Sequence, residues 1–317
     1  MATIVCVGEA LVEIMRTERD RPLDRPALFG GPYPSGAPAI SASCAARLGA
    51  SVGFIGTLGD DAFGACVRNR LAADGIDCSA LATDPDRLTA IAFVAYRSDG
   101  GRSFVFHLAH AAAAQVRMEQ VPPGYLDETR YLHLMGSSLS ASESLRETCY
   151  ALAKAVHEAG GVISLDPNLR SELLPVERIR DVCAPIVERA RIVMPSGEEL
   201  LTLTGAATLK EGAHYLIAQG VEIVALKRGE EGSTLYTADG ALDIPPYTVQ
   251  EVDPTGAGDS YDAALLVGLS ESWDLYRAGL FANAVGALAT TRLGPMEALY
   301  ARDEVLRFMA EQGRPLP

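Results

Sequence analysis

The sequence predicts an α/β protein in which helices cover both faces of a parallel sheet, a three-layer sandwich with a small β-sheet lid. The second half of the chain alternates between helix and strand patterns. It predicts strands at 161–165, 192–194 and 223–227, and helices at about 142–159, at about 209–219 and from about residue 198. Strands that alternate with helices at this spacing form parallel sheets covered on both faces. A second observation, a two-stranded segment at 88–108 without a helix, predicts the lid.

The first strand and helix are predicted close to the N-terminus. Residues 4–7 form a short apolar run that ends at Gly8, which is typical of a buried strand. Residues 37–49 are small and compatible with a helix, and Gly49 is a natural helix stop. Strand character returns at 51–55. The start of the chain therefore agrees with the α/β prediction.

The segment 88–108 is predicted to be a hairpin. Its strands are expected at 89–97 and 102–108, around the strong turn signal Ser98-Asp-Gly-Gly. Both faces of this hairpin carry apolar side chains, so both faces need a cover. We expect one cover to be the substrate cleft and the other to be a second subunit, which predicts a homodimer through the lid.

The irregular segment 16–34, rich in Arg and Pro, is expected to add to the same flap. No repeat, linker or low-complexity region divides the chain. We therefore expect one domain over residues 1–317, with a lid formed by about 12–34 and 88–110 inserted in it.

Composition limits the class of protein. The 317 residues are 48% apolar, enough for a buried core, and no apolar run reaches the roughly 18 residues of a membrane-spanning helix. The start of the chain shows no basic leader or cleavage pattern, and the six cysteines contain no C-x-x-C pair. These features predict a cytoplasmic protein with reduced thiols and no membrane partner. The net charge of −14 argues against nucleic acid as a partner, because nucleic-acid-binding surfaces are basic.

The most informative stretch reads Val252-Asp-Pro-Thr-Gly-Ala-Gly-Asp-Ser-Tyr-Asp-Ala-Ala-Leu-Leu. Its Thr255-Gly-Ala-Gly turn precedes a helix-compatible segment, and such a turn exposes backbone N–H groups that bind phosphate at a helix N-terminus. Asp259 would stand at the same helix end, where it could take a proton from an alcohol that attacks the γ-phosphate of ATP. The alternative is an ordinary glycine-rich turn with Asp259 as a helix cap. The turn alone leaves both interpretations open.

The rest of the sequence decides between them. Asp253-Pro-Thr-Gly-Ala-Gly-Asp resembles the C-terminal signature of ribokinase-like (PfkB-type) carbohydrate kinases, written D-T-T-G-A-G-D, and departs from it only at Pro254. Further motifs resemble this family in the right order over nearly the whole chain. They are Gly8-Glu-Ala-Leu-Val-Glu, Ser35-Gly-Ala-Pro-Ala, Asp166-Pro-Asn-Leu-Arg, Ser196-Gly-Glu-Glu, Lys227-Arg-Gly-Glu-Glu-Gly and Asn283-Ala-Val-Gly-Ala-Leu-Ala. The Asp166 motif is similar to the D-x-N-x-R of fructokinases and 2-keto-3-deoxygluconate kinases, and the resemblance implies a Rossmann-like, ribokinase-like fold.

For the chemistry, the resemblance implies that Asp259 is the catalytic base. Gly256, Ala257 and Gly258 would form the anion hole around the transferring phosphoryl group. The nucleotide site for ATP would be lined by Lys227, Gly229, Gly232, Asn283 and Ser196.

The resemblance also implies metal sites. Glu199 would hold Mg²⁺ through water, because a hard oxygen ligand suits that ion. Ser196, three residues earlier, stands where the family usually has Asn. Asp253 and Thr255 match positions that often hold a monovalent cation such as K⁺, but Pro254 between them departs from the pattern.

The sugar is expected between the carboxyl edge of the main sheet and the lid. Glu13 stands where relatives place an acidic side chain that accepts sugar hydroxyls. The other candidate sugar contacts are Gly36, Ala92, Tyr96, His107, Arg170 and Asp259. For Arg170 the alternative is a structural ion pair. Ile40 stands where many relatives have an Asn that contacts the sugar, so a ribose-type substrate is disfavoured.

Competing motifs carry less weight. The sequence has no G-x-x-x-x-G-K-[ST] phosphate loop and no H-R-D or D-F-G pair. His107 and His110 are spaced like a metal pair, but no Cys, Asp or Glu lies near enough in the sequence to complete a ligand set. Asp60 and Asp61 resemble a carboxylate pair and are expected instead to be solvated residues that cap a helix.

These observations predict an ATP-dependent sugar kinase for a neutral monosaccharide, a ketohexose such as fructose or tagatose. Sugar-acid kinases of the family carry a lid sequence like F-Y-R, whose Arg can pair with a carboxylate, whereas this chain has Phe106-His-Leu108. A 2-keto-3-deoxygluconate kinase is the alternative, since Arg97 or Arg102 of the hairpin could reach the substrate. A nucleoside kinase would share every catalytic motif, and a silent sugar sensor would lack the base or the anion hole.

Overall fold

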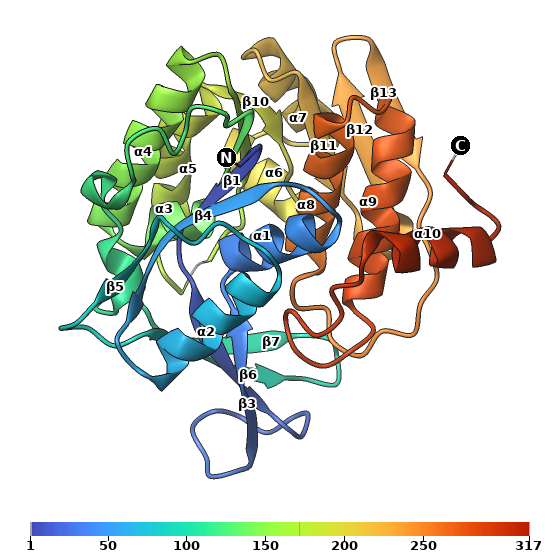
Figure 1. Cartoon of the computed structure of the whole chain (residues 1–317). Coiled ribbons are helices and arrows are strands. Elements are labelled where there is room, and N and C mark those ends of the chain that lie inside the picture. The colour runs from blue at the N-terminus through green and yellow to red at the C-terminus, as the bar shows by residue number, and fades with distance from the viewer. Residues whose placement is uncertain (1, 171, 317) are drawn as a thin grey trace.

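The computed structural model of the chain describes residues 2–170 and 172–316, which form a large sheet and a separate small one (Figure 1). The large sheet has nine strands in the order β13-β12-β11-β10-β9-β8-β1-β4-β5. Its strands are β1 (Ile4–Val7), β4 (Val52–Gly59), β5 (Leu81–Asp84), β8 (Tyr131–Met135), β9 (Val162–Asp166), β10 (Ala190–Val193), β11 (Ile223–Lys227), β12 (Ser233–Thr237) and β13 (Gly240–Ile244). From β11 to β5 all neighbouring strands run parallel. The predicted α/β class is confirmed.

Helices cover both faces of this sheet. They are α1 (Ala37–Arg47), α2 (Ala62–Ala73), α3 (Gly136–Ala141), α4 (Glu143–Glu158), α5 (Val176–Val187), α6 (Gly197–Thr204), α7 (Leu209–Ala218), α8 (Ala257–Ser270), α9 (Leu275–Ala289) and α10 (Arg302–Glu311), with short 3₁₀ turns η1 (Ala112–Gln115), η2 (Met118–Gln120) and η3 (Gly229–Glu231). Alternate strand residues point to opposite faces. Ile4 and Cys6 pack with α1, α2, α8, α9 and α10, whereas Val5 and Val7 pack with the helices α3 to α7. This alternation produces the three layers.

The small sheet contains β2 (Leu11–Arg16), β3 (Phe29–Ser35), β6 (Ala90–Tyr96) and β7 (Arg102–His107) in the order β3-β2-β6-β7. It projects below the large sheet in Figure 1. The predicted hairpin of 89–97 and 102–108 corresponds to β6 and β7. Strand β3 lies in a segment that was predicted to be irregular, because Pro32 and Pro34 are unfavourable in most strands. Since β3 is an edge strand, it tolerates these prolines.

The antiparallel hairpin of β12 and β13 was not predicted. Both strands pair antiparallel at one edge of the large sheet, so the sheet is mostly rather than wholly parallel. The two-residue loop between them is Ala238-Asp239, and Gly240 opens β13, so the Asp239-Gly240 dipeptide marks the turn in retrospect. The chain after β13 runs toward the start of α8, so the hairpin also helps to position residues of the functional site.

The strand order of the large sheet locates the functional site within the fold. In the large sheet β1 lies between β8 and β4. The chain after β1 adds β4 and β5 on one side of it, and later adds β8 on the other side, so the direction of the strand order reverses at β1. Ligands of open α/β sheets bind at the carboxyl ends of the strands near such a point.

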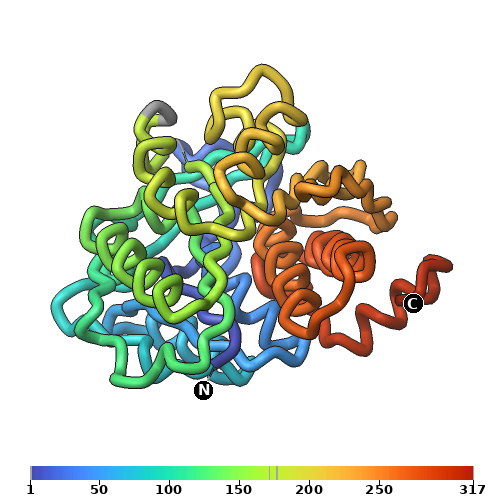
Figure 2. The backbone as a smooth tube through the Cα atoms, turned by 90° about the horizontal axis from the view of Figure 1, so that it is seen from above, coloured from blue at the N-terminus to red at the C-terminus, as the bar shows by residue number. Residues whose placement is uncertain are grey.

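Seen from above in Figure 2, the C-terminal segment runs along the outside of the molecule. Among the described residues, no helix combines the length and apolarity needed to cross a membrane.

Candidate active site

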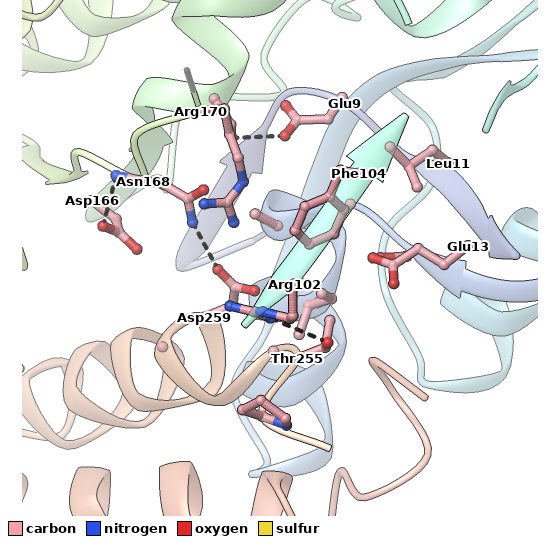
Figure 3. Close-up of a pocket in the computed structure, with 18 of the residues that line it drawn as sticks. Glu9, Leu11, Glu13, Arg102, Phe104, Asp166, Asn168, Arg170, Thr255 and Asp259 are labelled. Carbon is pink, nitrogen blue, oxygen red and sulfur yellow. Dashed lines mark hydrogen bonds between the residues drawn. The ribbon is translucent and has the colours of Figure 1, made fainter. Parts of the chain in front are cut away.

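A cavity of about 290 Å³ lies between the carboxyl edge of the large sheet and one face of the small sheet (Figure 3). We call it the first cavity. Its large-sheet side includes Glu9, Ser137, Asp166, Asn168, Arg170, Ser196 and Glu199, and its small-sheet side includes Leu11, Glu13, Arg102, Phe104, Phe106 and Leu108. The turn residues Thr255, Gly256, Gly258 and Asp259 lie between the two sides. The cavity is large enough for a monosaccharide-sized ligand.

The turn before α8 presents a helix N-terminus to this cavity. Gly256 is the N-cap residue and has φ 83°, a left-handed conformation that favours glycine. A Cβ atom there would lie 2.7 Å from the Pro295 carbonyl oxygen. The N–H of Ala257 donates to the Pro254 carbonyl at 3.3 Å, whereas the N–H groups of Gly256 and Gly258 donate to no described residue. These free N–H groups can bind an anion.

Asp259 is the third residue of α8. No side chain caps this helix, so the interpretation of Asp259 as a cap is wrong. Its carboxylate Oδ1 accepts a hydrogen bond from Asn168 Nδ2 at 3.2 Å, and Oδ2 has no donor among the described residues. Burial, with a smaller contribution from the charge of Asp166, raises the pKa of Asp259 to about 7. A carboxylate with this pKa and one free oxygen is suited to act as a general base near neutral pH.

Behind Asp259 lies a buried charge cluster centred on Lys227. The Lys227 ammonium donates to Asp166 Oδ2 at 2.8 Å and to both oxygens of Asp262 at 3.2 Å. Burial alone would raise the pKa of Asp166, but the charge of Lys227 holds it below its ordinary value. Burial raises the pKa of Asp262 well above its ordinary value. Lys227 lines the cavity as predicted, but its charge is already matched by these carboxyl groups.

Two buried glutamates line the first cavity near β2. Glu9 follows β1, and its two oxygens accept hydrogen bonds from the Ser137 and Ser138 hydroxyls at 2.7 and 2.5 Å. Glu13 accepts a hydrogen bond from the Ser35 hydroxyl at 2.6 Å, and its Oε2 is buried without a partner. Burial raises the pKa of Glu9 and brings that of Glu13 to about 7. The unpartnered oxygen of Glu13 is an acceptor available to a ligand hydroxyl.

Glu9 was not predicted as a site residue. The available signal was its position directly after a buried strand of the parallel sheet, where ligand contacts usually lie.

A second cavity, of about 510 Å³, opens on the other side of the turn. It is lined by Lys227, Gly229, Gly232, Tyr247, Val249, Tyr261, Asn283, Ala287 and Thr290, among others. The predicted nucleotide residues Lys227, Gly229, Gly232 and Asn283 are therefore together, whereas Ser196 lines the first cavity. The Asn283 amide donates to the Ile244 and Pro245 carbonyls at 3.1 and 3.0 Å, which fixes the chain after β13. Lys227, Gly229, Pro254 and Gly258 line both cavities, so the two meet at this turn.

Glu199 fits an indirect role in Mg²⁺ binding. One of its oxygens accepts the Leu169 N–H at 3.0 Å and the other accepts the Ser196 N–H at 2.8 Å. Each oxygen keeps a second lone pair, and the side chain lines the first cavity. Because Mg²⁺ retains several waters, Glu199 could accept a hydrogen bond from one of them.

The side chains of Asp253 and Thr255, which were predicted to hold a monovalent cation, form hydrogen bonds with neighbouring residues. The Asp253 carboxylate accepts hydrogen bonds from the Tyr96 hydroxyl at 2.8 Å, the Thr255 N–H at 3.0 Å and the Gly294 N–H at 2.9 Å. The Thr255 hydroxyl contacts Tyr96 at 2.9 Å and Arg102 at 3.3 Å. A monovalent-cation site at Asp253 and Thr255 stays a prediction. Tyr96, predicted as a sugar contact, instead joins the small sheet to the turn.

The register of the small sheet corrects the predicted substrate contacts of the other residues in the hairpin. Arg102, Phe104 and Phe106 line the first cavity, and the residues between them face the opposite side. His107 therefore faces away from the cavity and is exposed, which contradicts its predicted contact with the substrate. Ala92 pairs with Phe106 on the cavity side but is buried beneath the lining. The sequence analysis placed Arg102 near the substrate only as an alternative.

The remaining predicted contacts lie around the first cavity. Gly36 is the N-cap of α1 with φ 108°, and a Cβ atom there would lie 2.4 Å from the Glu9 carbonyl oxygen. Arg170 lines the cavity, and its Nη1 donates to the Leu169 carbonyl at 3.1 Å. No carboxylate of a described residue forms an ion pair with Arg170, so the structure does not support the ion-pair alternative. Figure 3 shows Arg170 and Asn168 across the cavity from Glu13 and Phe104.

Neither the Asp60–Asp61 pair nor the His107–His110 pair belongs to a metal site among the described residues. Asp61 is the N-cap of α2 and accepts hydrogen bonds from the Gly64 and Thr89 N–H groups at 2.8 Å. The prediction of a helix cap at this position is confirmed. Within residues 2–170 and 172–316, no three His, Cys, Asp or Glu side chains, His107 and His110 included, converge on a site for a metal ion.

Comparisons with known proteins agree with this geometry. A sequence model of the pfkB family carbohydrate kinases matches residues 1–302. Aminoimidazole riboside kinase of Salmonella typhimurium is 33% identical over 316 residues, which cover 98% of this chain and 96% of that protein. Fructokinase-1 of Oryza sativa subsp. japonica is 34% identical over 316 residues, covering 96% of this chain and 97% of that protein. A provisionally named ribokinase II of E. coli, solved in complex with ATP and Mg²⁺, is 38% identical with a TM-score of 0.92, covering 98% of this chain and 100% of that chain.

Proposed function

The chain belongs to the pfkB family of carbohydrate kinases, and from that premise we propose that it transfers the γ-phosphate of ATP to a hydroxyl of a neutral monosaccharide, a ketohexose such as fructose or tagatose. The observation that carries the proposal is the position of Asp259 and Gly258 where the two cavities meet. A sugar in the first cavity and a nucleotide in the second would bring the acceptor hydroxyl and the phosphate together at the N-terminus of α8.

The proposed mechanism uses groups of this chain in fixed positions. The free Oδ2 of Asp259 takes the proton of the acceptor hydroxyl as that oxygen attacks phosphorus. The unpaired N–H groups of Gly256 and Gly258 bind the charge that develops on the phosphoryl oxygens. Mg²⁺, when bound with ATP, would neutralise phosphate charge, and Glu199 would hold one of its waters. A monovalent cation such as K⁺, when bound, would lie at Asp253 and Thr255.

The first cavity supports a polyhydroxylated substrate. Glu13 Oε2 is a buried acceptor without a partner, and Glu9 lies beside it at the same end of the cavity. Neutral hydroxyl donors satisfy such carboxyl groups without adding another charge. The lid residue Phe106 and its neighbours lack the Arg of the F-Y-R pattern, which also favours a neutral sugar over a sugar acid.

A sugar acid is the second candidate, because two guanidinium groups line the first cavity. Neither Arg170 nor Arg102 forms an ion pair with a described residue; the Arg102 guanidinium donates to the Thr255 hydroxyl and lies over the face of Phe104. A substrate carboxylate could pair with either guanidinium. This observation supports 2-keto-3-deoxygluconate as a comparison substrate in every assay.

We also propose that the protein forms a homodimer through the outer face of the small sheet. On this face Phe93 packs edge-to-face with Phe29 and with His107, at centroid distances of 5.7 and 5.9 Å. Phe29 is 39% exposed and Val105 is 45% exposed. A second copy of the chain would cover these apolar side chains. The six free cysteines, four of them buried, support a reducing compartment such as the cytoplasm.

Formation of ADP from ATP tests the proposed function. The panel contains fructose, tagatose, ribose, 2-keto-3-deoxygluconate, aminoimidazole riboside and common nucleosides. We expect sugar-dependent ADP formation with a ketohexose, and only background ADP formation without an acceptor or with the Asp259→Asn variant. ADP formation only with ribosides would make the chain a nucleoside kinase, and no activity with any acceptor would favour a silent sugar sensor.

A further inference from the structure

Asn168 is held in an unusual conformation beside Asp259. It lies after β9 and is buried, and its φ of 36° is left-handed, which is uncommon for a residue with a side chain. The Asp166 carboxylate stabilises this conformation, because its Oδ1 accepts the Asn168 N–H at 3.1 Å. The Asn168 amide donates to Asp259 Oδ1 at 3.2 Å and is the only described donor to that carboxylate (Figure 3).

The backbone around Asn168 is fixed on both sides. On one side, Asp166 is held by the ammonium of Lys227 at 2.8 Å, and Lys227 is also bonded to Asp262 of α8. On the other side, the N–H of Leu169 donates to the Glu199 carboxylate at 3.0 Å. Such support from both neighbours keeps a strained residue in place, and strained residues often lie at functional sites.

We propose that Asn168 is a positioning residue that holds the Asp259 carboxylate in the orientation required for proton transfer. The proposal rests on the proposed function and deepens it. Asn168 occupies one oxygen of Asp259 with a neutral amide, so the other oxygen remains free to meet the acceptor hydroxyl. Without this hydrogen bond no side chain of a described residue would hold the Asp259 carboxylate in one orientation. Loss of the amide would also remove a hydrogen bond that stabilises the ionised carboxylate, and the pKa of Asp259 would rise.

Several charged groups act on Asp259 from the surrounding elements. They are Glu9 after β1, Asp166 and Arg170 at the end of β9, Lys227 at the end of β11 and Asp262 of α8. Their charges remain when Asn168 is replaced, so the contribution of its amide can be measured separately. A hydrogen bond to the charged form of an acid lowers its pKa, and its loss raises the pKa.

Two variants separate the amide from the backbone conformation. Asn168→Gly removes the side chain and still tolerates a positive φ, so the backbone is not strained by the change. Asn168→Asp keeps the shape but replaces the donor by an acceptor with a negative charge. Asn69 lies exposed on α2, and Asn69→Asp provides the same chemical change away from the site.

The test is a carbon-13 NMR titration of the aspartate carboxyl groups in the full chain without substrate. The Asp259 signal is identified by its loss in Asp259→Asn. We expect its midpoint to rise by about one pH unit in Asn168→Gly, since one unit corresponds to an interaction of about 1.4 kcal/mol. The midpoint should rise further in Asn168→Asp, through like-charge repulsion, and stay unchanged in Asn69→Asp.

An unchanged midpoint in Asn168→Gly would overturn the proposal, even if Asn168→Asp raised it through charge alone. Once an acceptor is known, Asn168→Gly should lower kcat by about 10- to 100-fold, the range for a lost hydrogen bond to a charged group, and leave the KM for ATP unchanged. A raised KM for ATP with an unshifted pH profile would instead make Asn168 a phosphate ligand. The titration needs no substrate, so an inactive wild-type chain would refute the proposed function and leave this result standing.

Discussion

The two walls of the first cavity are built in different ways. The large-sheet wall includes Asp166 and Asn168, which are buried and linked by hydrogen bonds to each other and to Asp259 of the adjoining turn. The small-sheet wall is formed by Arg102, Phe104 and other side chains of short strands, and two of its rings, Phe104 and Phe106, stack at 5.4 Å. The large-sheet wall holds reactive groups in fixed positions. The small-sheet wall offers side chains that can be substituted with few consequences for the fold.

This difference suggests a division of labour. Groups that transfer a proton or bind a phosphoryl charge must be held within a fraction of an ångström, which a rigid sheet edge and a helix N-terminus can do. Groups that select a substrate need only match its shape and charge. We therefore expect substitutions in the large-sheet wall and the turn to lower kcat, and substitutions in the small-sheet wall to change KM and specificity.

The largest effect is expected for Asp259→Asn. The amide cannot take a proton from the acceptor, so kcat should fall by about 10²–10⁴-fold, the usual weight of a positioned base. ATP binding, measured by calorimetry, should survive because the second cavity is unchanged. A variant that keeps more than about a third of wild-type turnover would remove Asp259 from this role.

Gly256→Ala should have the next largest effect. A Cβ atom at Gly256 would lie 2.7 Å from the Pro295 carbonyl, so the turn must move and its N–H groups with it. We expect kcat to fall by about 10²–10³-fold, the cost of losing one oxyanion donor. Gly75→Ala is a matched control, because Gly75 has the same φ of 83° but nothing within 4 Å of the new atom. Equal losses of kcat in both variants would show that instability, not the anion hole, explains the effect.

The pH dependence of kcat should follow Asp259. The base is active when ionised, and burial raises its pKa to about 7, so activity should be full above this pH and lost below it. Between about pH 8 and pH 6 the ionised fraction, and with it kcat, should fall about tenfold. A profile that stays flat down to about pH 5 would mean that the proton acceptor has an ordinary carboxyl pKa.

Substitutions on the two faces of the small sheet should separate binding from assembly. Phe93→Asp places a charge on the outer face and should yield monomers with nearly unchanged kcat. Phe104→Asp places the same charge in the first cavity and should raise the KM for sugar without changing the assembly. Light scattering after gel filtration measures the assembly, and a monomeric wild type at micromolar concentration would contradict the dimer.

The sequence predicted the large-sheet wall and the turn better than the small-sheet wall. Asp259 and Gly256 belong to one continuous motif, so their relative positions follow from the chain itself. His107 was assigned to the cavity because the motif spacing does not reveal which face of a strand a residue occupies. A shift by one residue reverses every side chain of a strand, and only the register of β6 and β7 fixed Phe104 and Phe106 on the cavity side.

Contacts between segments far apart in the sequence were also beyond prediction. The hydroxyl of Tyr96 reaches Asp253, which lies 157 residues later in the chain. The ammonium of Lys227 pairs with Asp166 and Asp262, although its motif suggested a nucleotide contact. Both contacts depend on how separate elements pack, which local patterns do not encode.

The ratio of kcat/KM for fructose and tagatose to that for 2-keto-3-deoxygluconate tests the central claim most directly. A neutral sugar satisfies Glu9 and Glu13 through its hydroxyls, so we predict that the better ketohexose exceeds the acid by at least about tenfold, or 1.4 kcal/mol in transition-state binding. The same assays with Asp259→Asn confirm that the measured turnover belongs to this site. A preference of about tenfold or more for the acid would contradict the account and assign Arg102 or Arg170 to a substrate carboxylate.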